Sequence, residues 1–191
     1  PVLLPAATAV LLLLLGDGGG GGHGHRRLLW SRRLALASAV LGLGLALLLL
    51  RHADTGALAV YRLGDWPAPF GIVLVVDRLS ALMLVLTSLV ALPVLVYASG
   101  GWDHHGRYFH ALFQFQLMGL NGAFVTGDLF NLFVFFEVLL IASYVLMLHG
   151  SGAERLRVGL HYVVLNLTAS ALFLIGVAVV YALTGTLNFA D

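Results

Sequence analysis

The chain has 191 residues, of which 60% are hydrophobic and only 10% are charged, and its formal net charge is +1. Soluble domains carry about 25% charged residues, so this composition excludes an ordinary soluble protein and indicates an integral membrane protein. The absence of cysteine excludes disulfides, thiolate metal sites and cysteine nucleophiles. The net charge is too small to predict a nucleic acid partner.

Several apolar stretches are long enough to cross a bilayer, which takes about 20 mostly apolar residues per helix. The first stretch is short, but no small-residue cleavage site follows it and its arginines come after it, so we interpret it as a spanning helix rather than a signal peptide. The sequence therefore predicts an all-α, polytopic membrane protein with about six transmembrane helices. They are expected over residues 1–15, 29–50, 77–98, 108–126, 128–148 and 159–183.

Two connections have a distinctive composition. Residues 16–25 are rich in glycine and contain His23 and His25, but two histidines are an incomplete ligand set, so a flexible linker is the better interpretation. Within residues 57–76, two β-prone runs flank a Gly/Pro-rich turn, which predicts a small external β-hairpin. Residues 1–98 are thus expected to form an N-terminal three-helix region that contains both features.

The arginines are distributed unevenly between the two sides of the predicted bundle. Seven of the ten lie in the connections between helices one and two, three and four, and five and six. The positive-inside rule then places these connections in the cytoplasm and both ends of the chain outside.

Glu137 lies near the middle of the apolar run 129–148. An ionised carboxylate at the bilayer centre costs at least ~2.5 kcal/mol, and burial favours its protonated form. Intramembrane acids commonly carry protons, although a protonated acid hydrogen-bonded to a neighbouring helix is the structural alternative. Glu137 is therefore the candidate catalytic residue, as a proton carrier.

Polar residues in the last three predicted helices fall on single helix faces. In residues 108–126, His110, Gln114 and Asn121 lie at positions i, i+4 and i+11, which places them within about 40° of one another around the helix. In residues 128–148, Tyr144 lies on the same face as Glu137, roughly 10 Å further along the helix. Residues 159–183 repeat the arrangement, with Tyr162 and Tyr181 among their polar positions. The candidate proton-path residues are His110, Gln114, Asn121, Tyr144, His161, Asn166 and Ser170.

Periodicity does not separate two roles for these side chains. They can form interhelical hydrogen bonds, which contribute about 0.6 kcal/mol each, or hold a file of water that conducts protons to Glu137. We interpret His110 and His161 as polar anchors on the cytoplasmic side rather than obligatory carriers.

Residues 121–137, with the sequence NGAFVTGDLFNLFVFFE, closely resemble a signature of the D subunit of Mrp-type multisubunit sodium/proton antiporters. The stretches 66–74 and 77–80 and the closing residues 184–188 resemble the same subunit, so the resemblance covers nearly the whole chain. The glutamate is shared with proton-pumping membrane subunits of respiratory NADH:quinone oxidoreductase, whereas residues 66–71 favour the Mrp subunit.

The resemblance implies a secondary ion transporter subunit rather than an enzyme, with no cofactor, in a bacterial cell (inner) membrane. Its implied partners are other antiporter subunits, the lipid bilayer, protons, and sodium or another monovalent cation. Family members have two inverted repeats and intramembrane lysines in later helices, whereas this chain contains no lysine. Residues 108–191 then correspond to the first three helices of the first repeat, and we expect the chain to be a fragment. The alternatives are a subunit of a redox-driven proton pump and a non-transporting scaffold.

Overall fold

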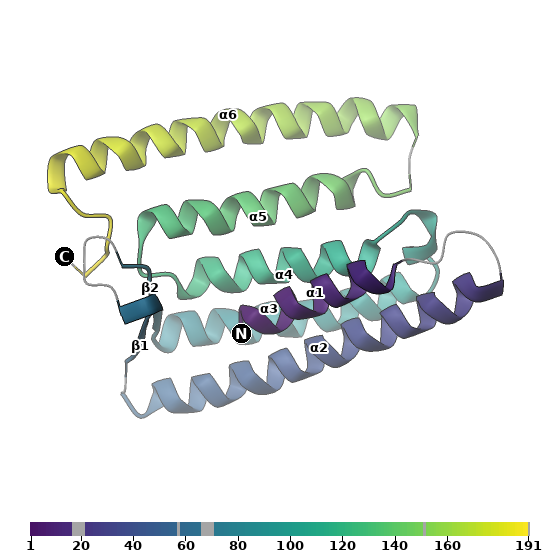
Figure 1. Ribbon diagram of the computed structural model, residues 1–191, viewed down its shortest axis with the longest axis horizontal. Helices are drawn as coiled ribbons and strands as arrows, with labels where there is room; N and C mark the ends of the chain where they lie inside the picture. Colours follow the sequence, from purple (N-terminus) through teal and green to yellow (C-terminus); the bar gives the residue numbers. More distant parts are fainter. Residues whose placement is uncertain (17–21, 57, 66–70, 151, 191) are drawn as a thin grey trace.

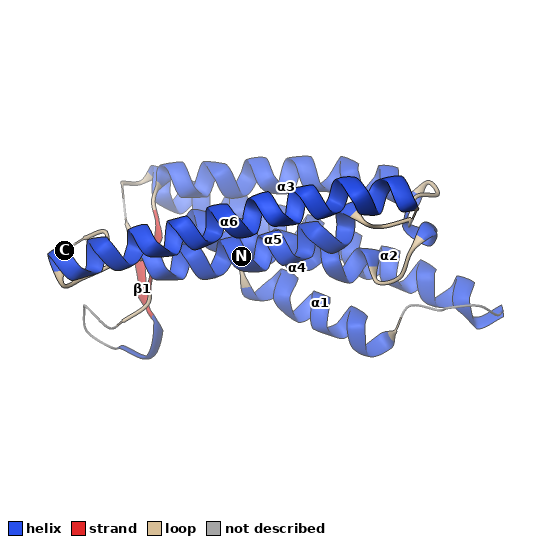
Figure 2. Cartoon of the chain, turned by 90° about the horizontal axis from the view of Figure 1, so that it is seen from above, coloured by secondary structure: helices blue, strands red, loops and turns tan. Residues whose placement is uncertain are grey.

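The computed structural model describes residues 1–16, 22–56, 58–65, 71–150 and 152–190. In these ranges the helices run side by side along a common axis, and a small hairpin lies at one end of the bundle (Figures 1 and 2). The helices are α1 (Leu3–Leu15), α2 (Gly22–Asp54), α3 (Arg78–Ser99), α4 (Phe109–Val125), α5 (Leu129–Met147) and α6 (Ala153–Thr184). The strands are β1 (Ala59–Arg62) and β2 (Val73–Val76), and the short 3-10 helices are η1 (Leu63–Asp65) and η2 (Asp103–His105).

Four helices in the described ranges are long and apolar enough to span a membrane, namely α2 from His25 onward, α3, α5 and α6. The 13 residues of α1 and the 17 residues of α4 fall short of that length. Helix α4 ends where Thr126 adopts an extended backbone and pairs with Leu74 of the hairpin. The predicted helical fold, with several helices long and apolar enough to cross a membrane, is confirmed, but the count of six spanning helices is not.

Two helices begin earlier than their apolar content predicts. Helix α2 begins at Gly22, inside the stretch 16–25 predicted as a linker, and α6 begins at Ala153 rather than near residue 159. The added turns carry charged residues, such as Arg26 and Arg27 in α2 and Glu154 and Arg155 in α6. Arginine and glutamate are compatible with helix but too polar for hydrocarbon. Hydropathy therefore marks the apolar part of a helix and misses its polar extension. The linker residues 17–21 lie outside the described ranges.

The predicted β-hairpin is present, with an antiparallel register that pairs Ala59 with Val76 and Arg62 with Val73. Its strands continue into a backbone network at the same end of the bundle. Gly127 donates its N–H to the Val73 carbonyl at 2.8 Å, and Phe189 donates to the Gly127 carbonyl at 2.9 Å. The α4–α5 connection is thereby held between the hairpin and the segment that follows α6.

Helix starts at this end are capped by aspartates. The Asp77 side chain accepts from the Ser80 N–H at 2.7 Å and starts α3, while Asp128 accepts from the Asn131 N–H at 2.8 Å and starts α5. Each cap satisfies a backbone donor that has no partner within its own helix. Asn131 also donates to Thr126 Oγ1 at 2.9 Å. Hydrogen bonds within residues 126–131, part of the stretch that resembles the antiporter signature, thus fix the turn between α4 and α5.

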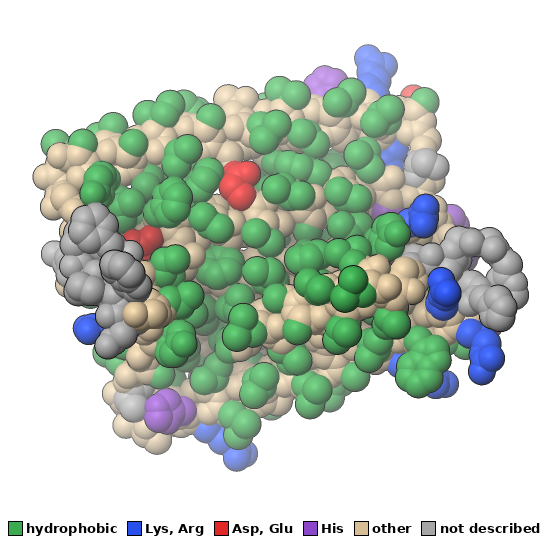
Figure 3. All heavy atoms as spheres, viewed as in Figure 1, with side chains coloured by type: hydrophobic (Ala, Val, Ile, Leu, Met, Phe, Trp, Pro, Cys, Tyr) green, Lys and Arg blue, Asp and Glu red, His purple; other side chains and the backbone are tan. Residues whose placement is uncertain are grey.

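The arrangement of the helices brings charge to the ends and apolar surface to the middle. Hydrophobic side chains cover the helices in Figure 3, and the larger group of Arg side chains lies at the end opposite the hairpin. The end of α1, the start of α2, the α3–α4 connection, the end of α5 and the start of α6 lie there (Figure 1). We call it the arginine end.

Candidate functional site

Glu137 lies between α5 and α6, where the Ser170 hydroxyl donates a hydrogen bond to its carboxylate. It is the ninth of the 19 residues of α5, and both side chains are half-buried. Ser170 is likewise distant from both ends of the 32-residue α6. The pair therefore lies midway along two adjacent, antiparallel helices.

A second polar group lies on the same interface toward the arginine end. The rings of Tyr144 and Tyr162 meet edge to face with centroids 5.7 Å apart, and Ser143 Oγ lies 3.4 Å from Tyr162 Oη. Asn166, half-buried between the two groups along α6, donates to the Tyr162 carbonyl at 2.8 Å. The buried Tyr144 hydroxyl has no hydrogen-bond partner among the described residues.

His161 lies outside this polar line. Its side chain is exposed, and its Nδ1 lies 2.9 Å from the Arg157 carbonyl one turn earlier in α6. Tyr181 is exposed near the opposite end of α6. The structure therefore brings Tyr144, Asn166 and Ser170 to the interface that holds Glu137, and leaves His161 at its edge.

The polar stripe of α4 has its hydrogen-bond partners in other elements. Gln114 is fully buried, donates to the Ala35 carbonyl at 3.1 Å and accepts from Ser38 at 3.4 Å. Asn121 donates to the Pro1 carbonyl at 3.2 Å. The partners of these two residues therefore belong to α2 and to the chain start that precedes α1, whereas Glu137 is hydrogen-bonded from α6.

His110, the third member of the stripe, belongs to an ionic cluster at the arginine end. Its Nε2 donates to Asp103 Oδ2 at 2.9 Å, and Arg32 donates to both carboxylate oxygens of Asp103, each at 2.7 Å. Burial of Asp103 favours its neutral form, but the hydrogen bonds from Arg32 and His110 outweigh burial and hold its pKa below the usual value. This cluster joins α2, η2 and α4.

The sequence alone does not predict this cluster. Asp103 lies between two predicted helices, and Arg32 serves there only as one of the arginines that assign the orientation in the membrane. The available signal is an acidic residue between two predicted helices, close to a histidine at the start of the second. No set of three or more His, Cys, Asp or Glu side chains suited to a metal ion occurs in the described ranges.

Two glycines of α4 allow a close approach to α5 near Glu137. A Cβ on Gly119 would lie 2.8 Å from the Leu139 nitrogen, and a Cβ on Gly122 would overlap the Phe135 ring. Small residues at helix interfaces permit this kind of backbone contact in membranes. Helix α5 is thus held between α4 on one side and α6 on the other.

Comparisons with known proteins point to one family. The family model described as the transmembrane part of NADH:quinone oxidoreductase and Mrp antiporters matches residues 126–191. The D subunit of a probable K⁺/H⁺ antiporter from Rhizobium meliloti (strain 1021) is 61% identical over 152 residues, which cover 78% of this chain and 28% of the relative. The D subunit of a Na⁺/H⁺ antiporter from Bacillus subtilis (strain 168) is 39% identical over 193 residues, covering 100% of this chain and 37% of the relative.

A comparison with solved structures also leads to an Mrp complex. A chain of the Mrp complex from Dietzia sp. DQ12-45-1b superposes with a TM-score of 0.86 at 32% identity, covering 98% of this chain and 35% of that chain. The chain thus spans about a third of the length of these relatives.

Proposed function

Because the chain belongs to the family of membrane subunits shared by Mrp antiporters and NADH:quinone oxidoreductases, and matches antiporter D subunits, we propose that it is part of a D-type antiporter subunit. The intact subunit would serve in a complex that exchanges a monovalent cation for protons. The relatives are named for potassium in one case and sodium in the other, so the proposed substrate class is a monovalent cation.

The observation that supports this proposal is the hydrogen bond between Ser170 and the carboxylate of Glu137, midway along α5. A carboxylate at this depth is costly to ionise, and an interfacial hydroxyl reduces that cost by donating to the anion. A serine hydroxyl can also accept, so the same contact accommodates the protonated acid. Glu137 is proposed as the proton carrier because its partner suits both forms.

Proton delivery to Glu137 is proposed to follow the α5–α6 interface. Tyr144 and Asn166 lie on this interface toward the arginine end, and the Tyr144 hydroxyl is buried without a partner among the described residues. A file of water molecules running from this hydroxyl to Glu137 is part of the proposal, since buried water commonly satisfies such atoms. For His110, Gln114 and Asn121, the hydrogen bonds to other elements support a packing role instead.

The driving step is proposed to be a change in the charge near Glu137. An approaching cation favours the ionised carboxylate and its removal favours the protonated one, so movement of that cation would load and release a proton. The family resemblance implies a lysine as this partner. The 191 residues contain no lysine, so it would come from another part of the intact subunit or complex.

The proposed setting is the bacterial cell membrane, with six crossings, the arginine end in the cytoplasm, and the hairpin and chain ends outside. The distribution of the arginines supports this orientation. Other antiporter subunits are the proposed partners, whereas a redox-driven pump would co-purify with flavin and iron-sulfur subunits.

The proposal is tested by Glu137→Gln in the intact, assembled complex. Glutamine keeps the size and hydrogen bonding of the protonated acid but cannot exchange a proton, so cation/proton exchange in vesicles should be lost while assembly is retained. Glu154→Gln makes the same chemical change at an exposed site in the first turn of α6 and should leave exchange unchanged. Wild-type exchange in Glu137→Gln, at equal amounts of complex, would remove Glu137 from the mechanism.

A further inference from the structure

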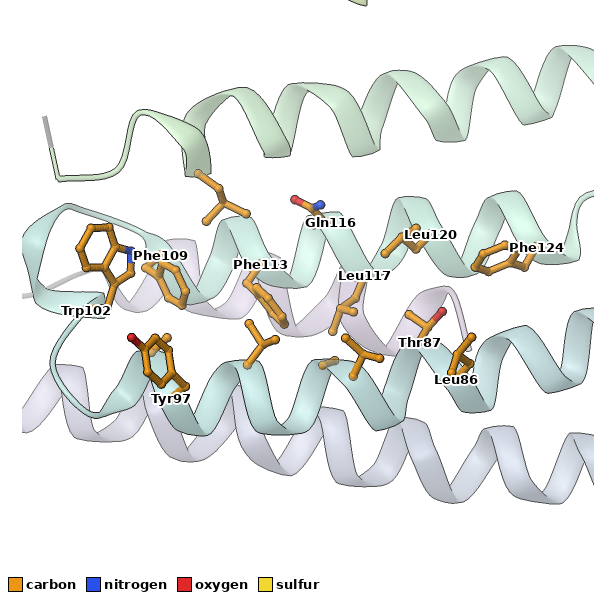
Figure 4. Close-up of a pocket in the computed structure, with 15 residues that line it drawn as sticks. Leu86, Thr87, Tyr97, Trp102, Phe109, Phe113, Gln116, Leu117, Leu120 and Phe124 are labelled. Carbon is orange, nitrogen blue, oxygen red and sulfur yellow. The ribbon is translucent and has the colours of Figure 1, made fainter. Parts of the chain in front are cut away.

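A groove of about 560 Å³ lies between α3 and α4, away from the α5–α6 interface. Figure 4 shows side chains from the two helices facing each other across it, with Leu86 and Tyr97 on α3 and Phe113 and Phe124 on α4. Most of its lining is apolar, and Leu86, Val90 and Tyr97 are 51%, 55% and 83% exposed. The groove is therefore open to the surroundings of the bundle.

The groove is long and narrow. Its lining extends from Leu86 to Ala98 along α3, about 18 Å at 1.5 Å per residue, which exceeds the ~15 Å half-thickness of a bilayer's hydrocarbon. A helix of that length is about 10 Å across and occupies more than twice the groove volume. The dimensions match an extended hydrocarbon chain better than a protein helix.

One end of the groove has the features of a membrane interface. Trp102 lines this end, and the Arg155 guanidinium lies 5.1 Å from the centre of the Trp102 ring. Arg155 donates to the His149 carbonyl, but a guanidinium carries five N–H groups, so further donors remain. The apolar groove thus ends beside an aromatic ring and a cation at the arginine end.

We infer that this groove binds an anionic phospholipid, with an acyl chain lying along α3 and α4 and the phosphate held by Arg155. Tryptophan and tyrosine favour the headgroup level, and basic sites between helices on the cytoplasmic side bind anionic headgroups. The inference does not depend on ion exchange, because it uses none of the residues around Glu137.

Trp102 provides a reporter inside the groove. With Trp30→Phe and Trp66→Phe as the background, its fluorescence is measured in phosphatidylcholine vesicles that contain increasing amounts of phosphatidylglycerol with brominated acyl chains. Brominated phosphatidylcholine is the reference. Half-maximal quenching should need about fivefold less brominated phosphatidylglycerol, the preference expected for one arginine near the surface.

Two substitutions on α6 separate a site from general charge attraction. Arg155→Gln should abolish the preference for phosphatidylglycerol, whereas Arg157→Gln, an exposed neighbour two residues away, should retain it. Val90→Phe places a larger side chain in the groove at an exposed position of its lining. It should weaken quenching by both lipids, and this effect should not depend on Arg155. Equal quenching by the two lipids, or the same preference in Arg155→Gln, would overturn the inference. Absence of quenching by either lipid would also overturn it, because a protein segment would then cover the groove.

Discussion

The Ser170 hydroxyl of α6 donates to the Glu137 carboxylate of α5, which links two antiparallel helices at the middle of the bundle. The two residues are 33 positions apart in the sequence. Among the described residues, Ser170 alone forms a hydrogen bond with the Glu137 side chain. The behaviour of this acid is therefore expected to depend on Ser170.

Ser170→Ala is expected to slow cation/proton exchange in the intact complex by about tenfold, because a hydrogen bond to a charged group contributes about 1.5 kcal/mol or more. Exchange is measured in vesicles at equal amounts of assembled complex. Ser170→Thr keeps the hydroxyl and should restore most of the rate. Unchanged exchange in the alanine variant would mean that this hydroxyl has no part in the proton step.

The orientation of the bundle is expected to appear in the labelling of single cysteines, since the chain has no cysteine of its own. Leu58 is 68% exposed beside the hairpin, and Glu154 is exposed at the arginine end. In intact cells, Leu58→Cys should react with an impermeant thiol reagent, and Glu154→Cys should react only after permeabilisation. The opposite pattern would invert the topology derived from the arginines.

Acid is expected to weaken the packing of α2 against α4 through Asp103. The pKa of this carboxyl is lowered, so its ionised form adds stability that is present above the ordinary value of 3.8 and is lost as the pH falls through the lower folded-state pKa. Asp103→Asn should remove this stability already at pH 7, by about 3 kcal/mol, because it leaves the Arg32 charge partly buried and unpaired.

Thermal unfolding in detergent as a function of pH measures this effect. Asp54→Asn is the matched control, since Asp54 and Arg78 form an exposed pair at 3.8 Å, and such pairs contribute about 0–1 kcal/mol. If Asp103→Asn unfolds at the same temperature as Asp54→Asn, the buried cluster does not stabilise the bundle.

Gly122→Ala is expected to destabilise the contact between α4 and α5. The added methyl group would overlap the Phe135 ring, and overpacking of this kind costs about 1–3 kcal/mol. Gly176→Ala in α6 is the control, because its Cβ would meet no described atom within 4 Å apart from its chain neighbours and its own helix backbone, and alanine favours helix. A thermal shift assay compares them: the Gly122 variant should unfold at lower temperature and the Gly176 variant should not. Equal stability of the two would show that α5 moves away from α4 at little cost.

Much of the architecture follows from the sequence because the bilayer restricts what an apolar chain can do. The predicted span 77–98 agrees within one residue at each end with α3 at Arg78–Ser99. The predicted span 128–148 agrees equally well with α5 at Leu129–Met147. The hairpin follows from two β-prone runs around a turn. Where polar residues extend a helix, as at Gly22 and Ala153, hydropathy no longer locates its start.

The sequence by itself determined that Glu137 is exceptional, since an acid within an apolar helix is costly and thus informative wherever it occurs. Only the tertiary structure decided which side chains accompany it. Periodicity places Gln114 on one face of α4 and Ser170 on one face of α6, but it does not state which neighbouring helix each face meets. The packing of α5 between α4 and α6 brings Ser170 to Glu137, while Gln114 bonds to α2. That assignment depends on close approach at Gly119 and Gly122 and on contacts between distant segments, which no local pattern encodes.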